Sequence, residues 1–164
     1  MSNYYIPYEW YALLLMVLGD WQEVRKFEDV LKEAFRCAND GTKMKSAVIL
    51  WGPAGSGKST ILNLLQMVLE KGIRNKIAYN VVFAHDWDFM KAPNTENIEW
   101  QYIMKHPVIF AASNHLINEE YYPYWNYIFA TTGQRFEPEV YEAIVKVCED
   151  HAEDIYKYYA EEEN

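Results

Sequence analysis

An eight-residue segment, Gly52–Ser59, constrains the fold more than any other part of the chain. Its sequence, GPAGSGKS, matches the phosphate-binding pattern G-x-x-x-x-G-K-[ST] at every position. Glycines let the chain curl so that successive backbone N–H groups point into one hollow. A helix that begins at this hollow adds the positive end of its dipole. The segment therefore predicts a loop that binds phosphate between a strand and a helix.

The residue types in this loop predict how a nucleoside triphosphate is held. Lys58 supplies a mobile cation for the β- and γ-phosphates, the Ser59 hydroxyl is expected to ligate Mg²⁺, and Thr60 lies just behind it. The expected ligands are therefore ATP and Mg²⁺. The residues predicted to bind the nucleotide are Gly52, Pro53, Ala54, Gly55, Ser56, Gly57, Lys58, Ser59 and Thr60.

The hydrophobic pattern around the loop predicts an α/β fold. Apolar residues at helical spacing, together with end signals, predict helices over Pro7–Leu18, Trp21–Ala38 and Ser59–Lys71, the last capped by Gly72, and a final helix from Pro138 through the 150s. Short apolar runs predict strands at Ser46–Trp51, Ala78–His85, Pro107–Ser113 and Tyr127–Thr131. Strands that alternate with helices are typical of a three-layer P-loop NTPase with a mostly parallel sheet. We expect a helical segment over 1–45, an ATPase core over 46–137 and a C-terminal helix over 138–164, together forming one compact domain.

Two carboxylates follow the second predicted strand. Asp86 and Asp88 come at the end of an apolar run, where a P-loop enzyme needs an acid for Mg²⁺ or for the attacking water. Because they are two residues apart, they share a face if the strand extends that far. We prefer Asp86 as the metal-side acid, with Asp88 as the second choice. The alternative is a solvated turn at the end of the strand.

Asn114 ends the third predicted strand, Pro107–Ser113. An amide at the tip of a buried strand beside the phosphate loop can contact the γ-phosphate and hold the attacking water. An asparagine that simply ends the strand in a turn is the alternative.

These segments together resemble superfamily 3 helicases, the AAA+-like ATPases of small DNA viruses, phages and plasmids. The similarity rests on Ile49–Thr60, on His106–Asn114, which is similar to the family's motif C with its sensor asparagine, and on the helical segment before the loop. It covers roughly residues 25–137. The resemblance implies ATP hydrolysis in DNA replication or packaging, by a homo-oligomeric ring or with a partner protein.

The family supplies an arginine finger after motif C, and here Arg135 lies near the corresponding position. The resemblance thus implies that Arg135 reaches into the site of a neighbouring subunit, whereas a surface arginine paired with Glu137 or Glu139 is the alternative. The basic DNA-gripping loop of the family has little room, since Lys91 and Lys105 are the only basic residues between Asp86 and His106. The sequence therefore favours a minimal ATPase over a complete helicase.

The net charge of −9 bears on the partners. General affinity for nucleic acid needs a surplus of Lys and Arg, so single-stranded DNA is an open but unsupported partner. The longest apolar run, Ala12–Leu18, is far shorter than the ~20 residues of a membrane span. We therefore expect no membrane association and a cytoplasmic location, in the host cytoplasm if the protein is viral or from a phage.

Two other functions fit a P-loop protein of this size. A small nucleoside or nucleotide kinase usually carries its loop very near the N-terminus and has an Arg-rich lid, whereas here about fifty residues precede the loop and only Arg135 follows Lys76 as an arginine. The second of these functions is that of a nucleotide-binding interaction protein that does not hydrolyse ATP.

Overall fold

The computed structural model describes residues 5–85, 87–123 and 125–161. Its centre is a four-stranded sheet formed by β1 (Val48–Trp51), β2 (Val81–Ala84), β3 (Val108–Ser113) and β4 (Tyr127–Ala130). The strand order is β2-β3-β1-β4, and all three neighbouring pairs are parallel. An α/β fold built on a parallel sheet, as the sequence predicts, is therefore confirmed.

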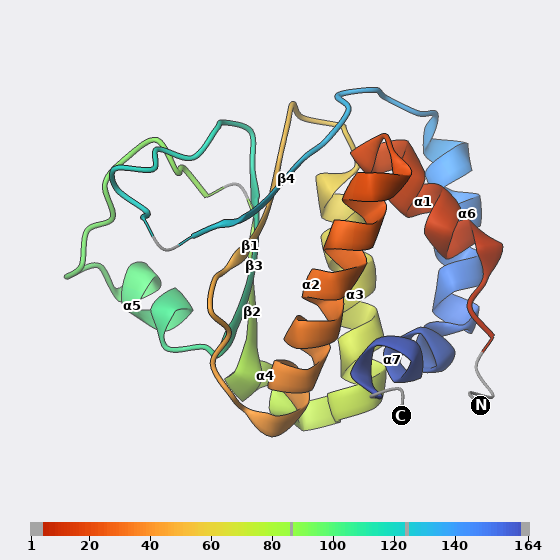
Figure 1. The fold of residues 1–164 in the computed structure, drawn as a ribbon, viewed down its shortest axis with the longest axis horizontal. Helices are drawn as coiled ribbons and strands as arrows, with labels where there is room; N and C mark the ends of the chain where they lie inside the picture. The colour runs from red at the N-terminus through yellow and green to blue at the C-terminus, as the bar shows by residue number, and fades with distance from the viewer. Residues whose placement is uncertain (1–4, 86, 124, 162–164) are drawn as a thin grey trace.

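Helices cover the two faces of this sheet unequally (Figure 1). One face carries five helices, namely α1 (Tyr8–Leu18), α2 (Trp21–Asp40), α3 (Lys58–Ile73), α6 (Pro138–Asp150) and α7 (Ala152–Ala160). The other face carries α5 (Ile98–Met104) and the long connections on either side of it. Short pieces η1 (Arg74–Lys76) and α4 (Ile77–Asn80) lead from α3 into β2.

Alternating strand residues feed two separate hydrophobic cores. Val48 and Leu50 of β1 belong to the core under the helices, whereas Ile49 belongs to the core under α5. In β3, Phe110 belongs to the core under the helices, and Ile109 belongs to the core under α5. Both faces of the sheet are buried, which explains why the strands are continuous apolar runs rather than alternating ones.

The N-terminal helices belong to the main core rather than to a separate segment. In α1, the Trp10 indole N–H donates to the Tyr159 hydroxyl of α7 at 2.7 Å, and that hydroxyl donates to the Glu28 carboxylate of α2 at 2.7 Å. Trp10, Phe27 and Phe35 are fully buried in the same cluster as the strand residues. The sequence boundaries at 45 and 137 therefore do not separate independent packing units.

Most predicted elements lie within a residue or two of their expected bounds, but several details of the prediction are wrong. Residues 78–80, expected in the second strand, belong to α4, where the Asn80 side chain donates to the Ala38 carbonyl near the end of α2. Gly72 is not a cap but lies inside α3, where the Tyr156 ring packs directly on it. The last helix is divided at His151 into α6 and α7.

Helix α5 is absent from the sequence-based prediction. Its start signal is Asn97, whose side-chain oxygen accepts from the backbone N–H groups of Glu99 and Trp100. Within the part of the chain that the structure describes, no helix is both long enough and apolar enough to cross a membrane.

Candidate functional site

The predicted phosphate-binding loop, residues 52–57 and called the phosphate loop below, lies where the connections of two neighbouring strands diverge. The chain leaves β1 toward the helical face through α3, whereas the chain leaving β3 packs on the opposite face through Ile117 and Trp125. In open parallel sheets, such a reversal leaves a crevice beside the carboxyl ends of the strands, and ligands bind there. The loop over 52–57 and Asn114 both lie at this crevice.

Local geometry leaves the start of α3 open to an anion. The Gly52 N–H donates to the Ser113 carbonyl at 3.1 Å, which ties the loop to β3. Gly57 is the N-cap of α3 with φ of 97°, a left-handed conformation that favours glycine. Among the described residues, no side chain caps this helix end with a hydrogen bond, and the first N–H groups of any helix lack partners within the helix. The partial positive charge at this end therefore faces the crevice.

Lys58 is a buried cation beside the open helix end. It is only 5% exposed, and its Nζ donates to the carbonyls of Gly52 at 2.6 Å and Pro53 at 2.8 Å. These contacts fold the ammonium back over the loop. A buried ammonium needs polar or anionic partners, and these two carbonyls are not its complete set of contacts.

A cavity of about 540 Å³ adjoins the loop. Three groups of residues line it, and they come from the loop with the start of α3, from the tip of β3, and from the region of α6. These are Ala54, Gly55, Gly57, Lys58, Ser59 and Thr60, then Asn114, and then Phe136, Pro138, Tyr141 and Glu142. The volume lies within the range of small-molecule sites in proteins.

The wall formed by α6 is the part of the site that sequence reasoning missed. Pro138 is correctly predicted to start a helix. The spacing of apolar residues, however, does not predict which helix will pack against a loop that is distant in the sequence. Tyr141 stands out here, because its hydroxyl oxygen is buried and has no hydrogen-bond partner within residues 5–85, 87–123 and 125–161. Burial raises the pKa of Tyr141, so its phenol is a protonated donor at neutral pH.

The predicted site residues are only partly brought together. Lys58, Ser59, Thr60 and Asn114 line one cavity, as expected for residues that act on one ligand. Asp86 lies outside the described residues, so its role stays a prediction.

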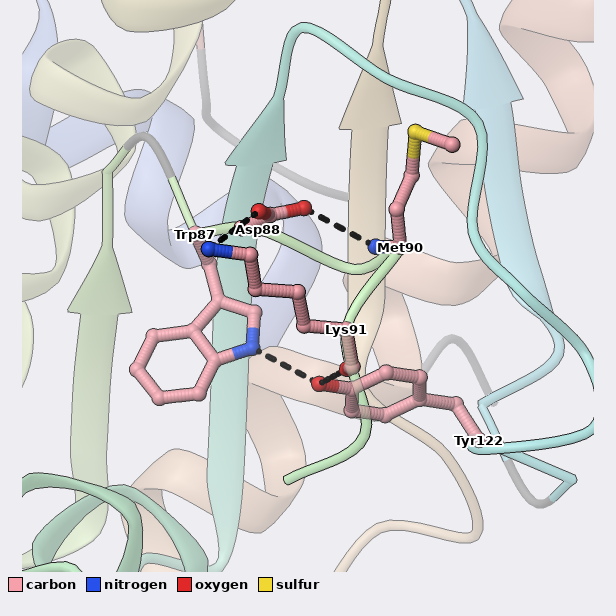
Figure 2. A network of polar contacts seen from close by, with 5 residues as sticks. All are labelled: Trp87, Asp88, Met90, Lys91 and Tyr122. Carbon is pink, nitrogen blue, oxygen red and sulfur yellow. Dashed lines mark hydrogen bonds and ion pairs between the residues drawn. The ribbon is translucent and has the colours of Figure 1, made fainter. Parts of the chain in front are cut away.

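Asp88 lies elsewhere, beyond the end of β2 (Figure 2). Its carboxylate accepts from the Met90 N–H at 3.0 Å and lies 3.9 Å from the Lys91 ammonium. It lines a second cavity, of about 290 Å³, and not the one at the phosphate loop. β2 ends at Ala84, so the strand does not extend to Asp88.

The second cavity is bounded by packed aromatic rings. The Trp87 indole N–H donates to the Tyr122 hydroxyl at 3.2 Å, and that hydroxyl donates to the Lys91 carbonyl at 2.9 Å (Figure 2). Trp100 stacks on Trp125 with centroids 5.7 Å apart. Tyr122 and Trp125 are buried, so these two residues serve mainly to cover the second face of the sheet.

Arg135 lies beside the phosphate loop of its own chain. Its Nε lies 3.3 Å from the position that a Cβ on Gly55 would occupy. Neither Glu137 nor Glu139 forms an ion pair with it, and no other carboxylate of the described ranges lies within 4.0 Å of its guanidinium. The surface pairing considered from the sequence is therefore not formed.

Comparison with known proteins returns no assignment: no protein-family model matches this chain, and no curated protein matches it.

Proposed function

We propose that this chain binds ATP with Mg²⁺ through Gly52–Ser59 and hydrolyses it. The proposal extends to a minimal ATPase of the superfamily 3 helicase type, which acts in viral or phage DNA replication or packaging as a ring or with a partner protein. The observation that carries it is the buried Lys58 at the start of α3, in the lining of a cavity of about 540 Å³ that Asn114 also lines.

The residues of the cavity fit a triphosphate. The backbone N–H groups at the start of α3 are oriented to bind phosphate oxygens, and Lys58 lies close enough to exchange its carbonyl contacts for charge-assisted ones. The buried Gly57 leaves no room for a side chain, because an added Cβ would lie 2.6 Å from Val17 Cγ2. The packing of α1 against the loop and the positive φ of Gly57 therefore both require glycine here.

The residues also suit Mg²⁺ as it binds in phosphate sites. Ser59 lines the cavity at the position whose hydroxyl ligates the metal in P-loops, and Asp86 is the acid expected from the sequence. Mg²⁺ keeps several waters and takes few protein ligands. When bound, it would neutralise charge that develops on the transferred phosphoryl group.

Within this proposal each residue has one task. The loop backbone holds the phosphates, Lys58 contacts the β- and γ-phosphates, and Asn114 orients the attacking water from the tip of β3. These groups are placed before the reaction begins, and preorganised donors of this kind usually make the largest contribution to catalysis.

The test separates hydrolysis from the other functions that the sequence left open. Wild-type protein and Lys58→Ala are compared for ATP binding and for Mg²⁺-dependent phosphate release, first alone, then with nucleosides, then with single-stranded DNA. Phosphate release by the wild type alone supports the ATPase. Transfer to a nucleoside supports a kinase instead, and binding without turnover supports a nucleotide-dependent interaction protein. Equal ATP binding by wild type and Lys58→Ala would overturn the proposal.

A further inference from the structure

The connection between β4 and α6 follows the phosphate loop closely. This connection, residues 131–137, is called the strap below. An added Cβ on Gly52 would collide with the Thr131 hydroxyl, and Gly55 faces Arg135 in the same way at 3.3 Å. Beyond the strap, the Tyr141 hydroxyl lies 3.2 Å from the Cβ position of Gly57. Successive parts of the loop therefore face successive parts of the strap and α6.

Hydrogen bonds fix the strap in this place. The Thr131 hydroxyl donates to Ser56 Oγ at 2.9 Å, and the Thr131 N–H donates to the Trp51 carbonyl at 2.8 Å. The Thr132 N–H donates to the Val17 carbonyl at the end of α1 at 2.9 Å. Ser56 is almost completely buried. The strap is thus held to both ends of the loop and cannot move away from it without breaking these contacts.

Two donors lie on this side. Arg135 is exposed and pairs with no carboxylate of the described residues. The Tyr141 hydroxyl is buried and has no hydrogen-bond partner among those residues, and its ring packs edge-on against Phe136 at 5.9 Å. Buried polar groups without partners are uncommon and call for an explanation. The Arg135 Nε lies 3.3 Å from the Cβ position of Gly55 and the Tyr141 hydroxyl lies 3.2 Å from that of Gly57, so phosphate oxygens held by the loop would supply acceptors.

We propose that the strap and α6 complete the nucleotide site from within the same chain, with Arg135 and Tyr141 donating to phosphate oxygens held by the loop. This inference rests on the proposed nucleotide binding and adds a second wall to it. It assigns Arg135 to its own subunit instead of a neighbouring one. The site is then complete in a monomer, and its turnover does not depend on assembly.

The first experiment measures binding of ATP and ADP to Arg135→Ala in the absence of turnover. A guanidinium that contacts the terminal phosphates strengthens ATP binding more than ADP binding. We expect Arg135→Ala to lower ATP affinity about ten-fold or more, consistent with the loss of a charge-assisted hydrogen bond, and to reduce the preference for ATP over ADP. Arg25→Ala, which changes an exposed arginine of α2, is the matched control. Unchanged ATP and ADP affinities in Arg135→Ala would overturn the inference.

The second experiment uses Tyr141→Phe, which removes only the hydroxyl. A hydroxyl without a partner does not stabilise the empty protein, so its removal is expected to leave the melting temperature unchanged or raise it. The same change is expected to weaken ATP binding several-fold. Tyr156→Phe in α7 controls for a half-buried tyrosine away from the loop. A lower melting temperature with unchanged ATP affinity would assign Tyr141 to packing alone.

The third experiment separates action within a chain from action between chains. Specific ATPase activity is measured across a wide range of protein concentration, and Arg135→Ala is then mixed with Lys58→Ala. A flat activity and no recovery in the mixture support the same-chain site. Recovery in the mixture would overturn it in favour of a shared site between subunits. If the wild type fails to bind ATP at all, the proposed function fails, and this result is distinguishable from all of the above.

Discussion

Gly57 and Val17 lie so close together that a Cβ on Gly57 would be 2.6 Å from Val17 Cγ2. Val17 belongs to α1, and Gly57 is the N-cap of α3 at the phosphate loop. The N-terminal helix therefore supports the back of the loop directly. The helical segment that the sequence sets apart from the core therefore helps to hold this loop in place.

The first prediction concerns this contact. Gly57→Ala must place a side chain in a left-handed conformation, which costs about 1–2 kcal/mol, and must also displace Val17. We expect a lower melting temperature and weaker ATP binding. Gly41→Ala is the matched control, because Gly41 has φ of 79° but its nearest side-chain atom to an added Cβ is 3.8 Å away. Equal destabilisation by both substitutions would show that the Val17 contact adds nothing.

The second prediction concerns the buried ammonium of Lys58. Lys58→Ala removes the cation nearest the phosphates, so ATP binding or hydrolysis is expected to be abolished. Lys71→Ala, at an exposed position in the last turn of the same helix, controls for the loss of a positive charge. Binding is measured by calorimetry and turnover by phosphate release. Hydrolysis at the wild-type rate in Lys58→Ala would refute a phosphate-binding role.

The third prediction concerns Asn114 at the tip of β3. If the amide holds the attacking water, Asn114→Ala lowers turnover by roughly 10²-fold, as for loss of one preorganised donor, with little change in ATP affinity. Asn118→Ala, in the same connection, removes a side chain that instead accepts from the Glu120 N–H in a local turn. Loss of affinity with unchanged turnover would contradict the assigned role.

The fourth prediction compares the two candidate acids. Asp86→Asn is expected to lower Mg²⁺-dependent turnover more than ATP affinity. Asp88→Asn is expected to leave turnover unchanged, because the Asp88 carboxylate contacts Met90 and Lys91 at a different cavity (Figure 2). Turnover is measured over a range of Mg²⁺ concentrations for both variants. A larger loss of turnover in Asp88→Asn than in Asp86→Asn would assign the metal-side acid to Asp88 instead of Asp86.

The fifth prediction concerns stability and pH. The pKa of Glu28 is raised, because burial disfavours its charged form more than the Tyr159 hydrogen bond and Lys32 favour it. The folded state then binds this proton more readily than the unfolded chain, so the contribution of Glu28 to stability is present at low pH and lost as pH rises through its folded-state pKa. Glu28→Gln keeps an acceptor for Tyr159 and carries no charge. We expect it to have a higher melting temperature at pH 7 than the wild type.

A pH series tests the origin of that difference. The difference in melting temperature between Glu28→Gln and the wild type is expected to grow as pH rises from about 4.5, the ordinary pKa of a glutamate side chain. Glu149→Gln, an exposed position of α6, serves as the control. A difference in melting temperature that stays constant with pH would mean that the charge of Glu28 does not cause it.

The sequence by itself determined the loop, the strands and most of the helices. Gly52–Ser59 is a local pattern whose glycines permit a tight turn, whose lysine supplies a positive charge and whose serine supplies a hydroxyl. The strands were recognisable because both of their faces are buried, which makes them continuous apolar runs. Asn114 could be placed at the site, because carboxyl ends of parallel neighbours meet at one edge of a sheet.

Only the tertiary structure decided what surrounds the loop. Thr131 meets Ser56 across 75 positions of sequence, and Tyr141 meets Gly57 through the packing of α6 beside α1 and α3. No periodicity encodes which helix end will cover a distant loop, because that choice follows from how whole helices share a core. The same holds for Arg135, whose position beside Gly55 is set by hydrogen bonds of the strap rather than by its neighbours in sequence.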